Sequence, residues 1–474
     1  MLFPTTDFAI FLGIVFLGHW AVNRDRRRWV PFMLLASYVF YAWWDWRYVG
    51  LLIGVSALAQ LGARAVDRRD GAARRRALVL ALAATIAPLL YVKYYAFLAV
   101  NAANAAALLR IGWTPPLVEV VLPVGVSFYT FMAISYVVDV YRGVVRPCGT
   151  ADAFLYLAFF PHLVAGPIVR PAELVPQLQT PRDPVRIDVV GAGWLILGGL
   201  FKKVVIASYL SAAIVDPVFG DPSRHSGLEV LVGVWSFAAV IYADFSGYTD
   251  IAIGVARLLG FRFPPNFDRP YTATSIRDFW RRWHMTLSRW LRDYLYVPLG
   301  GSRGSEPRTA LNLLATMALG GLWHGAGWTF VVWGLVHGAF LVVERWKRRR
   351  RAIGVLAEVP DTGLVGWARR IVTFQLVCLG WVFFRADSLD TAVALLGRLA
   401  RGWDTPTVLV HPGVVLALAV GLGAQFLPAA PGRVVRAALA RLRPVPLGAA
   451  AALALFVITT LGPRGVAPFI YFRF

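Results

Sequence analysis

The sequence predicts an all-α, polytopic integral membrane protein, and three observations support that fold class. The 474 residues are 58% hydrophobic and only 16% charged, which leaves too few polar groups to cover a soluble protein of this length. Apolar runs long enough to cross a bilayer recur along the whole chain. Short arginine clusters separate these runs, as in multi-pass membrane proteins. No separate soluble domain or internal repeat is evident, so we expect one transmembrane domain over residues 1–474.

The candidate spans follow directly from the apolar runs. They lie near residues 6–22, 30–46, 48–64, 77–99, 119–141, 190–215, 228–256, 309–343, 370–385, 411–428 and 445–463. The first run lacks a basic leader and a small-residue cleavage site, so we interpret it as a retained span and not as a signal peptide.

The net charge of +22 does not indicate nucleic-acid binding, because the basic residues are grouped between apolar runs. Clusters such as "NRDRRRW" and "RWKRRRR" fit the positive-inside rule for cytoplasmic loops. Placing the clusters in the cytoplasm puts the N-terminus and the C-terminal "PFIYFRF" outside. The two cysteines, Cys148 and Cys378, form no pattern, so we predict neither a disulfide framework nor a metal–thiolate site.

Helix-breaking residues interrupt two apolar stretches. Pro123 and Gly125 lie in "VVLPVGVSFYTF", and Pro161, Gly166 and Pro167 lie in "FFPHLVAGPIVRP". Broken backbone at membrane depth is tolerated only where it is buried in protein or lines a cavity. We therefore expect an internal cavity near these breaks.

The segment "DFWRRWHMTLSRWLRDYLYVPLGG", residues 278–301, is unusually charged and aromatic for such a chain. From Trp280 onward its apolar residues follow helical spacing on one face, and His284 falls on that face, against the body of the protein. Four arginines fall on the other half of the helix: Arg281, Arg282, Arg289 and Arg292. The segment is too charged to face lipid across the bilayer, so it lies either at the interface or in a water-accessible, protein-lined cavity.

Residues 309–343 form a 35-residue run without Asp, Glu, Lys or Arg. As one helix the run would be roughly 50 Å long, against a hydrocarbon core of about 30 Å. Its centre reads "LGGLWHGAGW", with four glycines around His324. We predict two segments that meet at a glycine-loosened break near mid-membrane. An ionisable group at that depth is by default a functional hypothesis.

The two histidines together indicate a reaction chamber reached from the cytoplasm, because imidazole accepts and returns protons near neutral pH. A serine nucleophile is disfavoured by the lack of a Gly-x-Ser-x-Gly elbow. The sequence also lacks a Walker loop and HExxH, which disfavours ATP hydrolysis and zinc proteolysis.

At these residues the sequence resembles the membrane-bound O-acyltransferase (MBOAT) family, specifically its bacterial alginate O-acetyltransferase branch. The motifs that carry the resemblance run nearly end to end: "LPVGVSFYTFMAISYVVDVYRG", "FFPHLVAGPIVRP", "DFSGYTDIAIGVARLLGF", "PPNFDRPY", the 278–301 segment, "GLWHGAGWTFVVWGLVHG" and "GWVFFRA". The family's catalytic histidine corresponds to His324, and its second, upstream histidine to His284.

The resemblance implies roughly 10–12 transmembrane helices, with re-entrant or interfacial helices, around a central tunnel in a bacterial inner membrane. It implies transfer of an acyl group from a cytoplasmic thioester, usually a coenzyme A thioester, to an extracytoplasmic acceptor. No permanently bound cofactor or metal is expected. For a polysaccharide acceptor, as in alginate or another exopolysaccharide, an extracytoplasmic acyltransferase-like partner is expected.

Several polar residues have two possible interpretations. The four arginines contact donor phosphates or face solvent and lipid, and Asn266 and Asp268 shape the donor mouth or cap a turn. Asp244 and Asp250 orient a histidine or form structural pairs, for which arginine is the expected partner. The remaining histidines, among them His162 and His337, are interpreted as packing residues or receive no role.

The tail "PFIYFRF" also has two readings. It is either an aromatic anchor at the interface or, as in related acyl-transfer systems that end similarly, an acyl relay through Tyr471. Two other functions remain as alternatives. One is D-alanine transfer to teichoic acid from a small carrier protein, and the other is a membrane transporter without catalysis.

Overall fold

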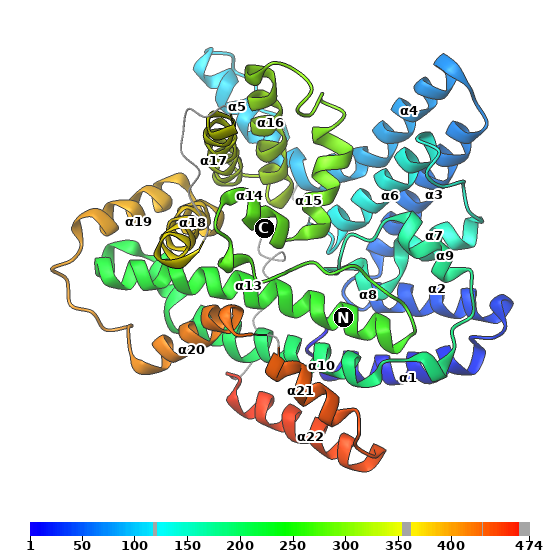
Figure 1. Ribbon diagram of the computed structural model, residues 1–474. Helices are drawn as coiled ribbons and strands as arrows, with labels where there is room; N and C mark the ends of the chain where they lie inside the picture. Colours follow the sequence, from blue (N-terminus) through cyan, green and yellow to red (C-terminus); the bar gives the residue numbers. More distant parts are fainter. Residues whose placement is uncertain (117–120, 353–361, 429, 464–474) are drawn as a thin grey trace. The chain divides into compact units, whose positions relative to one another are not determined.

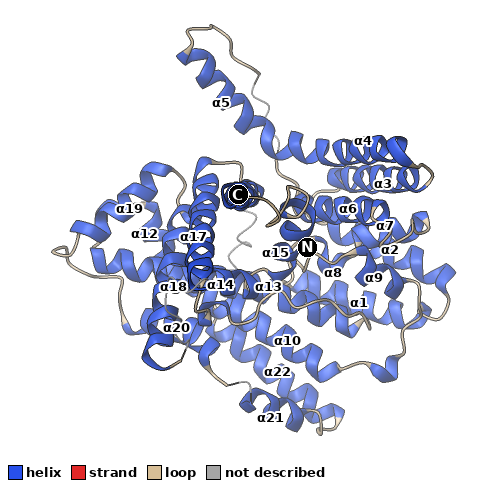
Figure 2. Cartoon of the chain, turned by 45° about the horizontal axis from the view of Figure 1, so that its top comes forward, coloured by secondary structure: helices blue, strands red, loops and turns tan. Residues whose placement is uncertain are grey.

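The computed structural model describes residues 1–116, 121–352, 362–428 and 430–463 (Figure 1). Within these residues all regular structure is helical and no strand occurs (Figure 2), which confirms the all-α fold class. The contacts divide the chain into two units, which are residues 1–192 with 252–264 and residues 193–251 with 265–474. Tyr471 lies outside the described residues, so the tail remains a sequence-based prediction.

The first unit contains α1 (Thr6–Val22), α2 (Arg26–Ala42), α3 (Arg47–Asp67), α4 (Gly71–Leu89), α5 (Tyr95–Leu108), α6 (Val126–Tyr141), α7 (Thr150–Ala158), α8 (Phe160–Leu163) and α9 (Pro171–Leu178). The second contains α11 (Ser208–Leu210), α12 (Asp216–Gly220), α14 (Ile276–Arg282), α15 (Met285–Leu291), α16 (Glu306–His324), α17 (Trp328–Ala352), α18 (Gly363–Arg385), α19 (Leu389–Arg401), α20 (Pro412–Gly423), α21 (Ala430–Leu439) and α22 (Pro444–Leu461). Residues of α10 (Val189–Leu200) and α13 (Gly227–Leu258) belong to both units.

Every apolar run that the sequence marked as a span contains helix in the described residues. Six continuous helical runs are long and apolar enough to cross a membrane, and a bent pair makes up to seven. Other apolar helices, such as α1 with 17 residues and α6 with 16, are shorter than the roughly 20 residues of a typical spanning helix. The described helices therefore support a multi-pass membrane protein, while the number of ten to twelve spans remains a prediction.

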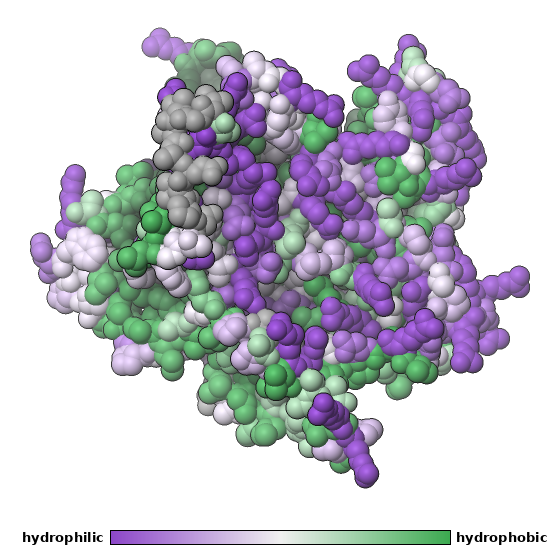
Figure 3. Space-filling view, in the orientation of Figure 1, coloured by the Kyte–Doolittle hydropathy of each residue, from purple (hydrophilic) through white to green (hydrophobic). Residues whose placement is uncertain are grey.

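The exposed surface of the helices agrees with a bilayer environment. On α22 the exposed fractions of Leu453 and Phe456 are 64% and 66%, and on α20 that of Leu416 is 67%. Figure 3 shows hydrophobic side chains over the region of α18 and α20, in contrast to the hydrophilic ends of α3 and α4. Apolar surface of this extent is stable where lipid and not water covers it.

The two predicted backbone breaks pack against each other inside the first unit. Gly125 has a positive φ of 77°, and a Cβ there would lie 2.5 Å from the carbonyl oxygen of Leu163. A Cβ on Gly166 would lie 2.5 Å from the Cα of His162, which is fully buried. Glycine is thus required because the chain approaches itself too closely for a side chain. The structure places these breaks in packed protein, not at the cavity described below.

In the second unit, α13 and the helical run that begins at α10 cross with their backbones in contact. A Cβ on Gly199 would lie 2.5 Å from the Gly247 carbonyl oxygen. The two aspartates pair across this crossing, Asp244 with buried Lys203 at 2.5 Å and Asp250 with Lys202 at 2.6 Å. The predicted structural pairing of the two aspartates is confirmed, but the prediction that their partners are arginines was wrong. The lysines come one helical turn after Gly199, where the close crossing brings them within reach of α13.

Candidate active site

His284 lies at a break between two short helices. The sequence pattern predicted one helix through Trp280 and Tyr294; instead α14 ends at Arg282 and α15 begins at Met285. His284 between them has φ 40° and ψ 54°, the left-handed conformation. That conformation costs a non-glycine residue about 1–2 kcal/mol, and hydrogen bonds that Asn266 accepts from Met285 and Thr286 hold it in place. The prediction of one continuous helix was therefore wrong, because a tertiary contact overrides the local periodicity.

The predicted burial of His284 is confirmed. Its side chain has no exposed surface and contacts the rings of Phe245, Phe267 and Trp323, with centroid distances of 4.6, 6.4 and 6.2 Å. Burial lowers the pKa of His284 to about 3, since the charged form loses its hydration there. Burial thus favours the neutral form of the imidazole.

His324 is the last residue of α16, and the predicted glycine break follows it. A Cβ on Gly321 would lie 2.1 Å from the carbonyl oxygen of Phe330, and one on Gly334 would lie 2.2 Å from that of Met317. The long apolar run thus folds into two helices, α16 and α17, that pack with their backbones in contact. The prediction of two segments is confirmed, and His324 marks the turn between them.

The structure brings the two histidines into one aromatic cluster. The ring of Trp323 lies 6.2 Å from His284 and 4.9 Å from His324, measured between centroids. His324 also contacts Trp333 at 5.0 Å and Phe384 at 5.1 Å. A site walled by aromatic rings excludes bulk water, which strengthens electrostatic interactions with a reacting group.

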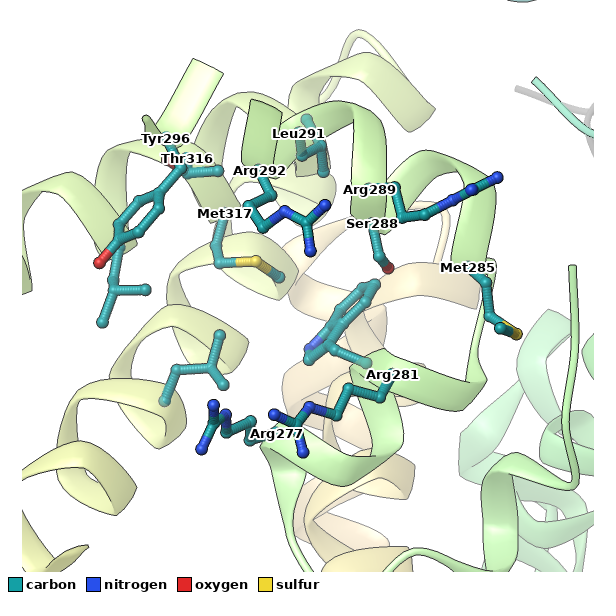
Figure 4. Close-up of a pocket in the computed structure, with 13 residues that line it drawn as sticks. Arg277, Arg281, Met285, Ser288, Arg289, Leu291, Arg292, Tyr296, Thr316 and Met317 are labelled. Carbon is teal, nitrogen blue, oxygen red and sulfur yellow. The ribbon is translucent and has the colours of Figure 1, made fainter. Parts of the chain in front are cut away.

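A cavity of about 490 Å³ lies beside this cluster, between α14, α15, α16 and α17 (Figure 4). Its lining is apolar except for hydroxyls, the Trp280 ring and four guanidinium groups. The lining residues are Arg277, Trp280, Arg281, Met285, Ser288, Arg289, Leu291, Arg292, Tyr296, Leu313, Thr316, Met317 and Leu341. In Figure 4 the guanidinium groups of Arg277 and Arg281 lie close together at one side of the cavity, and that of Arg292 extends into it.

The aromatic cluster connects the cavity wall to His324. Trp280, which lines the cavity, lies 5.8 Å from Trp333, and Trp333 lies 5.0 Å from His324, between ring centroids. Partial burial and the like charges of Arg348 and Arg281 lower the pKa of Arg277. Cations held together in this way favour an anionic ligand, which relieves both the repulsion and the lost hydration.

Three of the four predicted arginines line the cavity, and Arg282 does not. Its guanidinium contacts the carboxylates of Asp278 at 2.9 Å and Asp268 at 3.8 Å. Arg277 takes the fourth place, and the sequence analysis did not single it out. A usable signal was its spacing, because Arg277 precedes Arg281 by four residues and so shares its helix face. Asn266 contacts His284 and not the cavity.

The sequence was compared with known proteins. Residues 140–374 match the model of the MBOAT, membrane-bound O-acyltransferase, family. "Probable alginate O-acetylase AlgI" of Pseudomonas aeruginosa is 41% identical over 400 residues, which is 83% of this chain and 73% of that protein. A peptidoglycan O-acetyltransferase of Helicobacter pylori is 34% identical over 84% of this chain and 79% of its own length. A teichoic acid D-alanyltransferase of Streptococcus thermophilus is 26% identical over 55% of this chain and 67% of its own.

Proposed function

Because the chain belongs to the membrane-bound O-acyltransferase family and is an O-acyltransferase, we propose that it carries an acetyl group from a cytoplasmic coenzyme A thioester to an extracytoplasmic polysaccharide. The observation that carries the proposal is the arginine-lined cavity beside the aromatic cluster that contains both histidines. The relatives named as acetyl-transferring enzymes support the acetyl group and the polysaccharide class.

The charge distribution supports a cytoplasmic donor. The backbone N–H of Arg277, in the cavity wall, donates to the carboxylate of Glu344 at 3.0 Å. Glu344 precedes the basic run Lys347–Arg351 at the end of α17, which the positive-inside rule assigns to the cytoplasm. The donor phosphates bind the four guanidinium groups, and the apolar wall accommodates the uncharged arm that carries the thioester.

We assign the proton transfer of this reaction to His324. The acceptor hydroxyl attacks the thioester carbonyl carbon while the His324 imidazole takes the hydroxyl proton. The tetrahedral intermediate then collapses, the carbon–sulfur bond breaks, and the thiolate leaves and takes up the proton. The products are an acetyl ester and a free thiol. General base catalysis of this kind typically contributes about 10²–10⁴-fold in rate.

The acceptor side of the proposal includes a partner. We place the acceptor on the extracytoplasmic face, where an acyltransferase-like protein passes the acetyl group to the polysaccharide. Tyr471 is the candidate relay on this chain.

The charge of the cavity supports the coenzyme A donor over D-alanine transfer from a carrier protein. Coenzyme A presents several phosphate groups, whereas a carrier protein's prosthetic arm presents a single phosphodiester. Four arginines suit the more highly charged ligand. The acetyl-transferring relatives are also more similar to this chain than the D-alanyl-transferring one.

The adjacent residues Arg281 and Arg282 allow an experiment that tests the cavity as the donor site. Arg281→Gln removes a cation from the cavity, whereas Arg282→Gln is a matched change just outside it. In purified protein we expect Arg281→Gln to raise the KM for acetyl-CoA about tenfold or more, since a charged hydrogen bond contributes about 1.5–3 kcal/mol. We expect Arg282→Gln to leave that KM within about twofold.

The outcomes separate the candidate functions. Equal effects of both substitutions would remove the cavity as the donor site. Transfer from a D-alanyl carrier protein, with none from acetyl-CoA, would favour the alternative donor. A wild-type protein that moves a substrate without any acyl transfer would favour the transporter.

A further inference from the structure

The side-chain oxygen of Asn266 is the centre of a buried hydrogen-bond network around His284. Asn266 Oδ1 lies 3.1 Å from the backbone nitrogen of Thr286, 2.8 Å from Thr286 Oγ1 and 3.1 Å from Nδ1 of His284. The exposed fraction of Asn266 is 1%, and that of His284 is 0%. No bulk water competes for these hydrogen bonds.

The network determines which end of the amide faces His284. A backbone N–H is only a donor, so the Asn266 atom that contacts the Thr286 nitrogen is the amide oxygen. The amide nitrogen lies on the other side and donates to Thr249 Oγ1 at 3.4 Å. An amide oxygen is only an acceptor, so Nδ1 of His284 must be the ring nitrogen that carries the proton.

We propose that Asn266 is a positioning residue that holds His284 as the neutral Nδ1–H tautomer, so that Nε2 is the ring nitrogen that accepts a hydrogen bond. An accepting nitrogen holds an O–H or N–H group of a substrate, while the proton transfer itself remains with His324. It does not stabilise negative charge on the thioester oxygen. Asn266 therefore makes Nε2 of His284 a hydrogen-bond acceptor and excludes it as an oxyanion donor. This inference rests on the proposed acyl transfer.

The backbone around Asn266 is built to keep this geometry. The carbonyl oxygen of Asn266 accepts from the backbone nitrogen of Met285 at 2.9 Å. The backbone nitrogen of Asp268 donates to the carbonyl oxygen of Arg282 at 2.9 Å. These bonds join the loop to both sides of the helix break, and so they hold His284 in its left-handed conformation. Backbone held in such a conformation is characteristic of functional sites.

The protonation state of His284 also depends on the ionisable groups of the neighbouring helices and loops. His324 lies on α16, and its ring contacts the same Trp323 ring as that of His284. On α13, Asp244 and Asp250 are paired with lysines that face them from the helical run after α10. On α14, Arg282 is paired with Asp278 and with Asp268 of the preceding loop. Arg281, Arg289 and Arg292 are in the cavity wall.

The test compares Asn266→Asp with Asn266→Ala. The carboxylate of Asn266→Asp accepts the same hydrogen bonds and adds a negative charge next to the ring, which raises the pKa of His284. The enzyme is then protonated on His284 at a higher pH, so the acid limb of kcat/KM moves to higher pH while activity persists. Asn266→Ala removes the acceptor, and we expect kcat to fall about tenfold or more with the KM for acetyl-CoA unchanged.

Thr249→Val is the matched control, because it removes only the partner of the amide nitrogen. We expect its acid limb at the wild-type pH. The proposal is overturned if Asn266→Asp loses activity like Asn266→Ala with no movement of the acid limb, because a purely structural asparagine predicts that result.

A second measurement does not depend on activity. Solid-state NMR of histidine-labelled wild-type protein in lipid, assigned with His284→Ala, should show a protonated Nδ1 and an unprotonated Nε2 on His284 at neutral pH. A protonated Nε2 would overturn the tautomer assignment. Absence of acetyl transfer by the wild type would instead overturn the proposed function and leave the NMR result standing.

Discussion

At the scale of single residues, His324 is the side chain on which the proposed proton transfer depends. His324→Ala should abolish acetyl transfer while expression and membrane insertion persist, with a loss of about 10²–10⁴-fold in rate. The measurement is acetyl transfer by the purified variant at matched protein concentration. His411→Ala is the control, because His411 is exposed at the start of α20. Near-wild-type activity in His324→Ala would mean that another group takes the proton.

Residue type alone could not separate the two adjacent arginines of α14. Both looked equally suited to a phosphate in the sequence, but Arg281 lines the cavity and Arg282 pairs with two carboxylates. The difference arises from which neighbours each side chain meets. Asp278 lies one helical turn before Arg282 on α14, but Asp268 and the α16 and α17 residues that line the cavity with Arg281 come from other segments.

At the scale of helices, the α16–α17 pair depends on glycine. Gly321→Ala should force the two helices apart, since its Cβ would lie 2.1 Å from the Phe330 carbonyl oxygen. Overpacking of this kind typically costs about 1–3 kcal/mol, and it displaces His324 at the end of α16. We expect a lower unfolding temperature in detergent and a lower transfer rate.

Gly327→Ala is the matched control within the same helix break. Its Cβ would lie 3.6 Å from the nearest atom, the Phe330 ring, which is ordinary van der Waals contact. We expect this variant to unfold and to react like the wild type. If both alanine variants behaved alike, close backbone packing would not be what positions His324.

At the scale of the whole molecule, the orientation in the membrane decides where the donor enters. In a variant without Cys148 and Cys378, a cysteine near Arg27 or Arg349 should resist an impermeant thiol reagent in intact cells. A cysteine added after Phe474 should react, because positive-inside placement leaves the C-terminus outside. Labelling at Arg349 from outside would reverse the orientation and remove the cytoplasmic donor with it.

The sequence alone determined the fold class and the apolar runs that contain helix, and it singled out His284 and His324 as candidate residues. The apolar spans could be predicted from the sequence because the length and composition of an apolar run are local properties of the chain. The break after His324 was readable for the same reason, since 35 uncharged residues exceed one bilayer crossing and glycines mark the place of the turn.

Only the tertiary structure decided which contacts His284 and its neighbours make. The left-handed turn at His284, the lysine partners of Asp244 and Asp250, and the hydrogen bonds of Asn266 all depend on segments far apart in sequence. The period of a helix specifies which residues share a face, but it does not specify which segment packs there. A hydrogen bond from such a segment outweighs a local helical preference, because that preference is worth only about 0.7 kcal/mol per residue or less.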